Sequence, residues 1–99
     1  MNDDCGGGAA ALARTVTICN QRGLHARAAG RFVKVAGRFS AEIMVSKDGQ
    51  SVSGRSIMGL MMLAAGPGSA IEITSAGDDA PAAMEALIDL VECGFEEDD

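Results

Sequence analysis

The sequence contains no Trp or Tyr, and its only aromatic side chains are three Phe. A hydrophobic core must therefore be built from aliphatic side chains and from the six Met. Apolar residues still make up 47% of the 99 residues, which excludes a disordered chain and allows one domain with a modest core. We expect a single globular domain whose core is aliphatic and rich in Met.

Long hydrophobic runs are also missing, so we expect no membrane span. The opening residues 1–4 are acidic and lack the basic and apolar regions of a signal peptide. The three cysteines, Cys5, Cys19 and Cys93, are odd in number and form no Cys-x-x-Cys pair. This argues against a disulfide framework or a zinc site and predicts buried or incidental thiols in a reducing cytoplasm.

Basic residues are few, with eight Lys and Arg against fourteen Asp and Glu and a net charge of −6. Nucleic acid is therefore not an expected partner. Five of the eight basic residues lie between positions 22 and 38, whereas nine of the fourteen acids follow position 77. A basic helix on an acidic protein suits docking to an acidic protein partner, although a merely solvated helix face explains the charges equally well.

The hydrophobic pattern alternates between period two and period 3.6 along the chain. It predicts four strands, at 14–19, 41–46, 50–53 and 70–75, and three helices, at 26–36, 56–65 and 81–93. Gly37 is expected to end the first helix in a left-handed conformation, and Asp48-Gly49 is a hairpin turn signal. Residues 1–13 are predicted to be a flexible extension, residues 14–95 a single domain, and residues 96–99 an acidic tail.

The predicted order is thus β-α-β-β-α-β-α. Strands with polar alternate residues suit an antiparallel sheet with one wet face, and the helices must cover the other face. The predicted stripes on the second and third helices are Ile57, Leu60, Met61 and Ala64, and Met84, Leu87, Ile88 and Val91. The sequence therefore predicts an α+β open-faced sandwich.

The only histidine, His25, lies where the first strand pattern changes to the first helix pattern, at or next to the helix N-cap. The first N–H groups of a helix lack intrahelical partners and, with the helix dipole, favour an anion. An imidazole, a guanidinium at Arg27 and free N–H groups together could hold a phosphoryl group. From position alone, a surface or capping histidine is the commoner explanation.

The stretch Gly23-Leu24-His25-Ala26-Arg27, with Ala29 following, resembles the active-site signature of the HPr family, the histidine phosphocarriers of the phosphoenolpyruvate-dependent phosphotransferase system. A second stretch, residues 53–63, resembles the second helix of that family and its regulatory serine. The two motifs are in register, and the resemblance runs from about Thr15 to Val91. It implies an HPr-like fold with a four-stranded antiparallel sheet and three helices.

The resemblance also implies a function. His25 would accept a phosphoryl group from enzyme I and pass it to an enzyme IIA-type acceptor, and Arg27 would stabilise the phosphate. Such a protein is a carrier rather than an enzyme and needs no cofactor or metal. Ser56 aligns with the serine that an ATP-dependent HPr kinase modifies, but it could also simply cap the second helix. The expected partner surface, on a monomer, comprises Arg22, Leu24, Arg31, Ile57, Met58 and Met61.

One residue departs from the family pattern, because Ala28 stands where Pro usually follows the arginine. Ala keeps the helix but loosens its start and adds an N–H donor. This keeps open a second function, a regulatory docking module whose histidine is rarely charged. A small hydrolase such as an acylphosphatase is a third possibility, for which the sequence has no phosphate loop. Both the sugar-transport and the nitrogen-related branches of the phosphotransferase system remain open.

Overall fold

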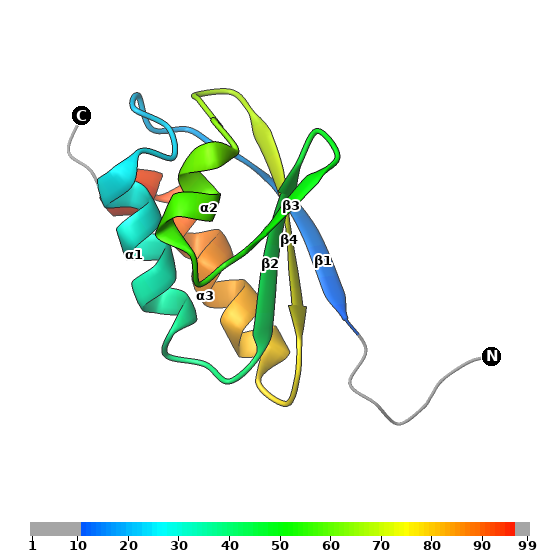
Figure 1. Cartoon of the computed structure of the whole chain (residues 1–99). Coiled ribbons are helices and arrows are strands. Elements are labelled where there is room, and N and C mark those ends of the chain that lie inside the picture. The colour runs from blue at the N-terminus through cyan, green and yellow to red at the C-terminus, as the bar shows by residue number, and fades with distance from the viewer. Residues whose placement is uncertain (1–10, 97–99) are drawn as a thin grey trace.

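The computed structural model describes residues 11–96 and has the predicted order of elements (Figure 1). Its elements are β1 (Leu12–Thr17), α1 (Ala26–Ala36), β2 (Glu42–Lys47), β3 (Gln50–Ser53), α2 (Ile57–Met62), β4 (Ala70–Ala76), α3 (Ala80–Glu92) and a 3₁₀ turn, η2 (Gly94–Glu96). No helix of this described range is long and apolar enough to cross a membrane. The predictions for residues 1–10 and 97–99 lie outside the described residues.

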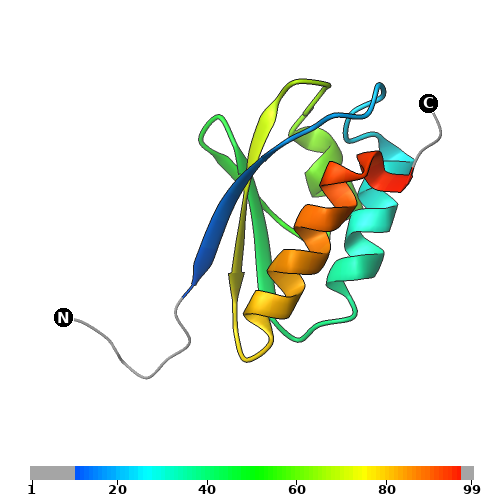
Figure 2. The ribbon, with the colours of Figure 1, turned by 180° about the vertical axis from the view of Figure 1, so that it is seen from behind.

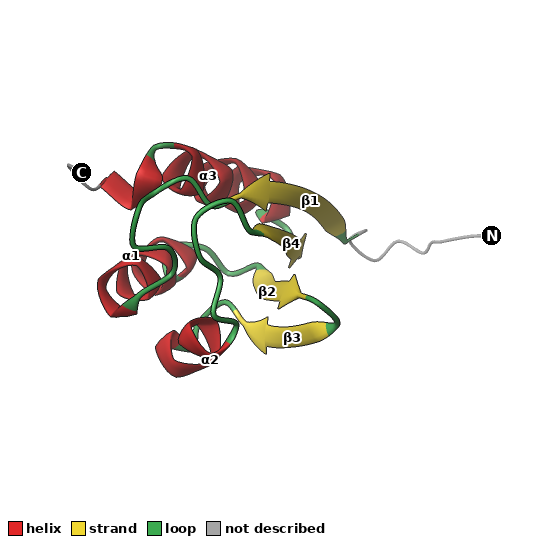
Figure 3. Cartoon of the chain, turned by 90° about the horizontal axis from the view of Figure 1, so that it is seen from above, coloured by secondary structure: helices red, strands yellow, loops and turns green. Residues whose placement is uncertain are grey.

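The four strands form one antiparallel sheet in the order β1-β4-β2-β3. All three helices lie on the same side of this sheet, which is plain from above (Figure 3). Seen from behind, α3 runs along β1 and beside α1 (Figure 2). The predicted α+β open-faced sandwich is therefore confirmed.

The core follows the alternation of the strands. Val16, Ile43 and Ile73 are buried under the helices, whereas neighbouring Thr15 and Glu72 are exposed on the helix-free face. The largest fully buried side chains include two of the three Phe, Phe32 and Phe95.

The expectation of a Met-rich core is wrong. Of the five Met among residues 11–96, only Met84 is buried, and three of the others are exposed on α2. The helix that carries them is short and lies beside β3, at an edge of the sheet, so that only one of its sides is covered.

The second helix is also shorter than predicted. It ends at Met62 rather than Ala65, because Ala64 adopts a left-handed φ of 54° before the Gly66-Pro67 break. Of the predicted stripe, only Leu60 is buried; the core position further along is filled by Leu63. In the third helix, Ile88 is half-buried, and the other three predicted core residues are buried.

Two other boundaries differ from the prediction. β1 begins at Leu12, so residues 12 and 13 belong to the sheet rather than to the extension. Gly37 is not left-handed: its φ is −68°, and its N–H closes α1 by donating to Val33 O at 2.9 Å. The turn at Asp48-Gly49 has the expected positive φ values, 52° and 82°.

The loop that leads into α1 is held by backbone contacts. Gly23 has a φ of 65°, and a Cβ added there would lie 2.4 Å from the carbonyl oxygen of Ala65. That oxygen accepts a 2.8 Å hydrogen bond from Leu24 N–H. Asn20 closes the turn by donating from Nδ2 to Gly23 O at 2.9 Å. Glycine is thus required at position 23 both by its conformation and by the close approach.

The opposite end of α1 is fixed by two charged side chains. The carboxylate of Asp79, at the start of α3, accepts hydrogen bonds from Ser40 N–H at 2.9 Å and Ala41 N–H at 2.8 Å. The guanidinium of Arg55 donates to three carbonyl oxygens, those of Ala36, Phe39 and Ala41. Asp79 thus joins the α1–β2 connection to the start of α3, and Arg55 joins it to the segment that precedes α2.

Replacing Gly23 by Ala should destabilise the fold by more than about 2 kcal/mol, because a left-handed residue then carries a Cβ that collides with Ala65 O. Gly30→Ala in the middle of α1 is the matched control. Nothing lies within 4 Å of its added Cβ, so this variant should gain about 1 kcal/mol of stability. Urea unfolding of both variants measures the two effects, and equal changes would contradict the assigned contact.

The Asp79 carboxylate should make stability depend on pH. The hydrogen bond from Ser40 N–H, helped by that from Ala41, lowers the pKa of Asp79 in the folded protein. The ionised form therefore stabilises the fold above the pKa of the unfolded chain, and this contribution is lost as the pH falls through the folded pKa. In Asp79→Asn, the urea midpoint should be lower than in wild type near neutral pH, and the two should converge in acid.

The variant Asp78→Asn removes a charge from the adjacent exposed position and is the control for net charge. A constant difference between wild type and Asp79→Asn across the acid range would show that the carboxylate's ionisation is not what holds residues 40 and 41.

Candidate functional site

His25 is the N-cap residue of α1, as the sequence predicts. Its backbone is extended, with φ −78° and ψ −178°, and its carbonyl accepts the first helical hydrogen bond from Ala29 N–H at 2.8 Å. Its ring atom Nδ1 accepts from Arg27 N–H at 3.2 Å. An imidazole therefore takes the capping role that Ser, Thr, Asp or Asn usually performs.

This hydrogen bond assigns the tautomer of the neutral ring. Because Nδ1 accepts from a backbone N–H, its lone pair is unprotonated and the ring proton lies on Nε2. This lone pair faces the first N–H groups of α1, where the helix dipole favours negative charge. The side chain is only half-buried, so a partner can reach it.

The basic side chains near His25 are not neutralised by acids within the described range. Among residues 11–96 the only ion pair joins Lys47 and Asp48, far along the chain. Arg22 and Arg27 are exposed, and their guanidinium groups form no hydrogen bond with other residues of this range. The segment 5–41 also contains no Asp or Glu. The basic residues of this loop and of α1 therefore have no acidic neighbours along the chain.

Arg31, which the sequence suggested for partner binding, is half-buried and has a structural contact. Its Nη1 donates to the carbonyl oxygen of Phe95, a fully buried residue with φ 58° in η2. Arg31 thereby joins the C-terminal turn to α1. Sequence reasoning missed Phe95, since an isolated Phe close to an acidic end carries no periodic signal.

An exposed apolar patch covers α2. Its members are Ile57, Met58, Met61 and Met62, whose exposed fractions run from 43% to 73%. Large exposed apolar side chains on a short helix are typical of a protein-binding surface, and Met suits one that adapts to several partners. Met62 was missed by the sequence reasoning, although it lies four residues after Met58 and shares its side of the helix.

Leu24 does not belong to this surface. Only 4% of it is exposed, because its side chain enters the core directly before α1. Ser56 caps α2: its Oγ accepts from Gly59 N–H at 3.0 Å, and the residue is partly exposed. α2 lies beside α1, and the hydrogen bond from Leu24 to Ala65 joins the start of one helix to the segment after the other (Figure 1).

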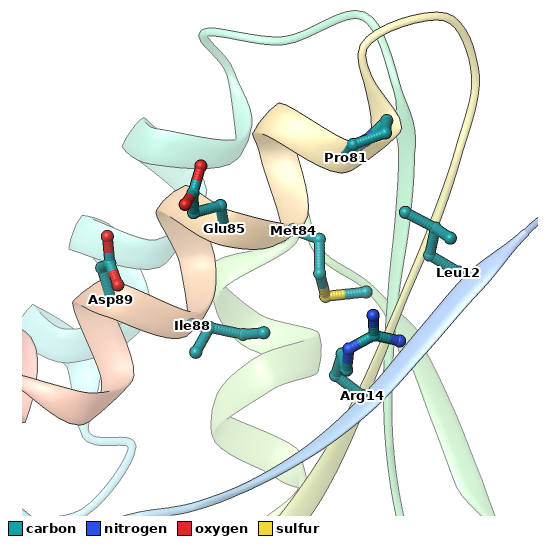
Figure 4. A pocket seen from close by; sticks show the side chains of 7 residues that line it. All are labelled: Leu12, Arg14, Pro81, Met84, Glu85, Ile88 and Asp89. Carbon is teal, nitrogen blue, oxygen red and sulfur yellow. The ribbon is translucent and has the colours of Figure 1, made fainter.

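The other features of the surface offer less chemistry. A hollow of about 320 Å³ lies between β1 and α3, where Arg14 approaches Met84 and where Leu12 and Ile88 complete an apolar floor (Figure 4). Its lining contains no His, Cys, Ser or Thr side chain and none of the predicted site residues. Within residues 11–96, no three His, Cys, Asp or Glu side chains gather closely enough to hold a metal ion. His25 and its surroundings are therefore the candidate site.

Comparison with known proteins gives one consistent match. A family model described as "PTS HPr component phosphorylation site" matches residues 12–93. The phosphocarrier protein HPr of Neisseria meningitidis serogroup B is 46% identical over 86 residues, which cover 87% of this chain and 97% of that protein. The phosphocarrier protein NPr of Shewanella violacea is 44% identical over 86 residues, which cover 87% of this chain and 94% of that protein.

The crystal structure of the phosphocarrier protein HPr from Bacillus anthracis superimposes with a TM-score of 0.80, at 48% identity over 83% of this chain and 98% of that one. Sequence and fold thus agree over nearly the whole domain. The chain belongs to the HPr family of the phosphotransferase system, whose members are phosphocarrier proteins and not enzymes.

Proposed function

We propose that His25 accepts a phosphoryl group from enzyme I, which is charged by phosphoenolpyruvate, and passes it to an enzyme IIA-type acceptor. The observation that carries this proposal is the capping geometry of the ring. Nδ1 of the only histidine accepts a hydrogen bond from Arg27 N–H at 3.2 Å, at the positive end of α1.

The transfer follows from this geometry. The Nδ1 lone pair attacks the phosphorus of the donor in line, the Nδ1–P bond forms, and the bond to the donor breaks. Arg27 N–H then donates to a phosphoryl oxygen instead of to Nδ1. The N–H groups and the dipole of α1 stabilise the negative phosphoryl group by about 0.3–1 kcal/mol, and by up to about 2 kcal/mol where it is partly buried. The Arg27 guanidinium, exposed and without an acidic partner among the described residues, adds charge-assisted hydrogen bonds.

A carrier must also keep the phosphoryl group from water. The chain supplies no Asp or Glu between positions 5 and 41, so the segment around His25 has no carboxylate that could activate a water molecule. The basic side chains stabilise the dianion without providing a base. These features support transfer rather than hydrolysis.

Ala28 takes the place of the family's usual Pro and is buried in α1. We expect transfer to survive this exchange, because Ala is compatible with the first turn of a helix. Its N–H is an additional donor at the helix start, where the phosphoryl oxygens would lie. The consequence we propose is a changed transfer rate or partner preference.

The partner surface in this proposal combines the two motifs. Arg22 and Arg27 supply positive charge, and Ile57, Met58 and Met61 supply an exposed apolar area on the neighbouring helix. Met62 extends this area, and Leu24 is left out because it is buried. Such a surface fits an acidic partner with an apolar docking site. We propose that the protein acts as a cytoplasmic monomer.

Ser56 is proposed as a second, regulatory phosphorylation site. Its hydroxyl caps α2 at the edge of the apolar patch and is partly exposed. A phosphate there is favourable for the helix start but places negative charge on the surface that docks enzyme I. The modifying enzyme would be an ATP-dependent HPr kinase.

The proposed carrier function is tested by intact mass spectrometry after incubation with phosphoenolpyruvate and enzyme I. Because relatives named HPr and NPr are similarly close, enzymes I from the sugar and the nitrogen branches are both used. Wild type should gain one acid-labile phosphoryl group, and His25→Ala should gain none, since it lacks the nucleophile.

The variant Arg27→Ala keeps the backbone donor and should be phosphorylated more slowly. If no enzyme I modifies the wild type, the carrier proposal fails and the docking-module alternative is favoured. If enzyme I phosphorylates only the Ala28→Pro variant, the failure of the wild type is caused by the missing Pro at the start of α1.

Substitutions of Ser56 separate charge from capping. Ser56→Asp and Ser56→Asn both retain a side-chain oxygen that caps α2, so both should unfold within about 0.5 kcal/mol of wild type. Only Asp adds a negative charge beside Ile57 and Met58. Steady-state phosphorylation by enzyme I should therefore show a KM raised about tenfold for Ser56→Asp and nearly unchanged for Ser56→Asn. Equal KM values would contradict the proposed regulation.

A further inference from the structure

Two cysteine thiols lie near carbonyl oxygens of the C-terminal end of α3. Cys19, in the segment after β1, places its Sγ 3.4 Å from Val91 O and 3.6 Å from Glu92 O. Cys93, the C-cap of α3, donates from its Sγ to Leu90 O at 3.3 Å. Both residues are exposed, so of the two expectations, buried or incidental thiols, burial does not hold for these two. Cys5 lies outside the described residues.

The two backbones run side by side here. Glu92, whose carbonyl contacts the Cys19 thiol, directly precedes Cys93. One residue further along each segment, a Cβ added to Gly94 would lie 3.7 Å from Cβ of Asn20. Successive contacts between 19–20 and 91–94 thus hold the two cysteines at neighbouring positions.

We infer that Cys19 and Cys93 form a reversible intramolecular disulfide when the protein meets an oxidant of the disulfide class, such as oxidised glutathione. This modification site is independent of the proposed phosphocarrier function. A disulfide needs Cα atoms roughly 4.4–6.8 Å apart, and both side chains must turn so that their sulfur atoms face one another. Cys93 is the C-cap of α3, with φ −90° and ψ 14°, and its backbone has therefore already left the helical conformation.

The chemistry balances through two exchange steps. The thiolate of one cysteine attacks a sulfur of oxidised glutathione, which forms a mixed disulfide and releases one glutathione thiolate. The second cysteine thiolate then attacks the protein sulfur of that mixed disulfide and displaces the second glutathione. Two protein thiols lose two electrons and two protons, and one oxidised glutathione becomes two reduced molecules.

The bond would join the loop before His25 to the end of α3. That loop contains the Asn20–Gly23 turn, and the α3 end leads to Phe95, which Arg31 holds to α1. Oxidation therefore ties together two of the segments that surround the start of α1. In a reducing cytoplasm the thiols stay free, and an exposed pair of this kind is oxidised only under stress.

The test uses the full chain with Cys5→Ser, which leaves the two thiols in question. After incubation with oxidised glutathione and removal of the excess, the intact mass should fall by two hydrogens, with no bound glutathione. Peptide mapping without reductant should find Cys19 joined to Cys93, and dithiothreitol should reverse the change. The oxidised form should melt about 5 °C or more above the reduced form, because the cross-link closes a long loop.

The single variants Cys19→Ser and Cys93→Ser, each combined with Cys5→Ser, are the controls and should carry one glutathione. Two glutathione molecules on the protein with both thiols, or a dimer linked between chains, would show that the thiols cannot reach one another and would overturn the inference.

Discussion

The geometry of the site depends on one close approach of backbone to backbone, that of Gly23 to the carbonyl of Ala65. A side chain at position 23 would lie 2.4 Å from that oxygen, and the same oxygen binds Leu24 N–H. The chain can therefore enter α1 from only one direction, with Leu24 buried behind it. His25 then falls at the N-cap, where its ring can turn back on the helix. A glycine thus determines where the proposed phosphoryl acceptor lies.

At that position the histidine supplies a hydrogen-bond acceptor that the start of α1 otherwise lacks. The first N–H groups of a helix need acceptors, and Nδ1 supplies one when the site is uncharged. In the proposed phosphorylated state, the phosphoryl oxygens would supply more of them. Because the same donors serve both states, little rearrangement is needed between accepting and passing on the group. The distribution of charge also favours binding of the phosphoryl group, since the basic segment 22–38 contains no acid.

Local features were predictable from the sequence, whereas features set by distant packing were not. The capping of α1 by His25 and of α2 by Ser56, the strand faces and the Asp48-Gly49 turn all follow from residues within a few positions. The exposure of Met61 follows from the edge position of α2, which no periodicity reveals. The early end of that helix follows from the left-handed conformation of Ala64, which is not a glycine and gives no such signal. Asp79 is the N-cap residue of α3, but its carboxylate makes no capping hydrogen bond and reaches across to residues 40 and 41.

The atom that we propose as the carrier of the phosphoryl group is Nδ1 rather than Nε2. Long-range ¹H–¹⁵N correlation spectra of the imidazole, recorded before and after phosphorylation by enzyme I, distinguish the two nitrogens directly. The unmodified ring should show its proton on Nε2, and the phosphorylated ring should show phosphorus coupling at Nδ1 together with a shifted Arg27 amide signal. Coupling at Nε2, with the Arg27 amide unchanged, would contradict the account.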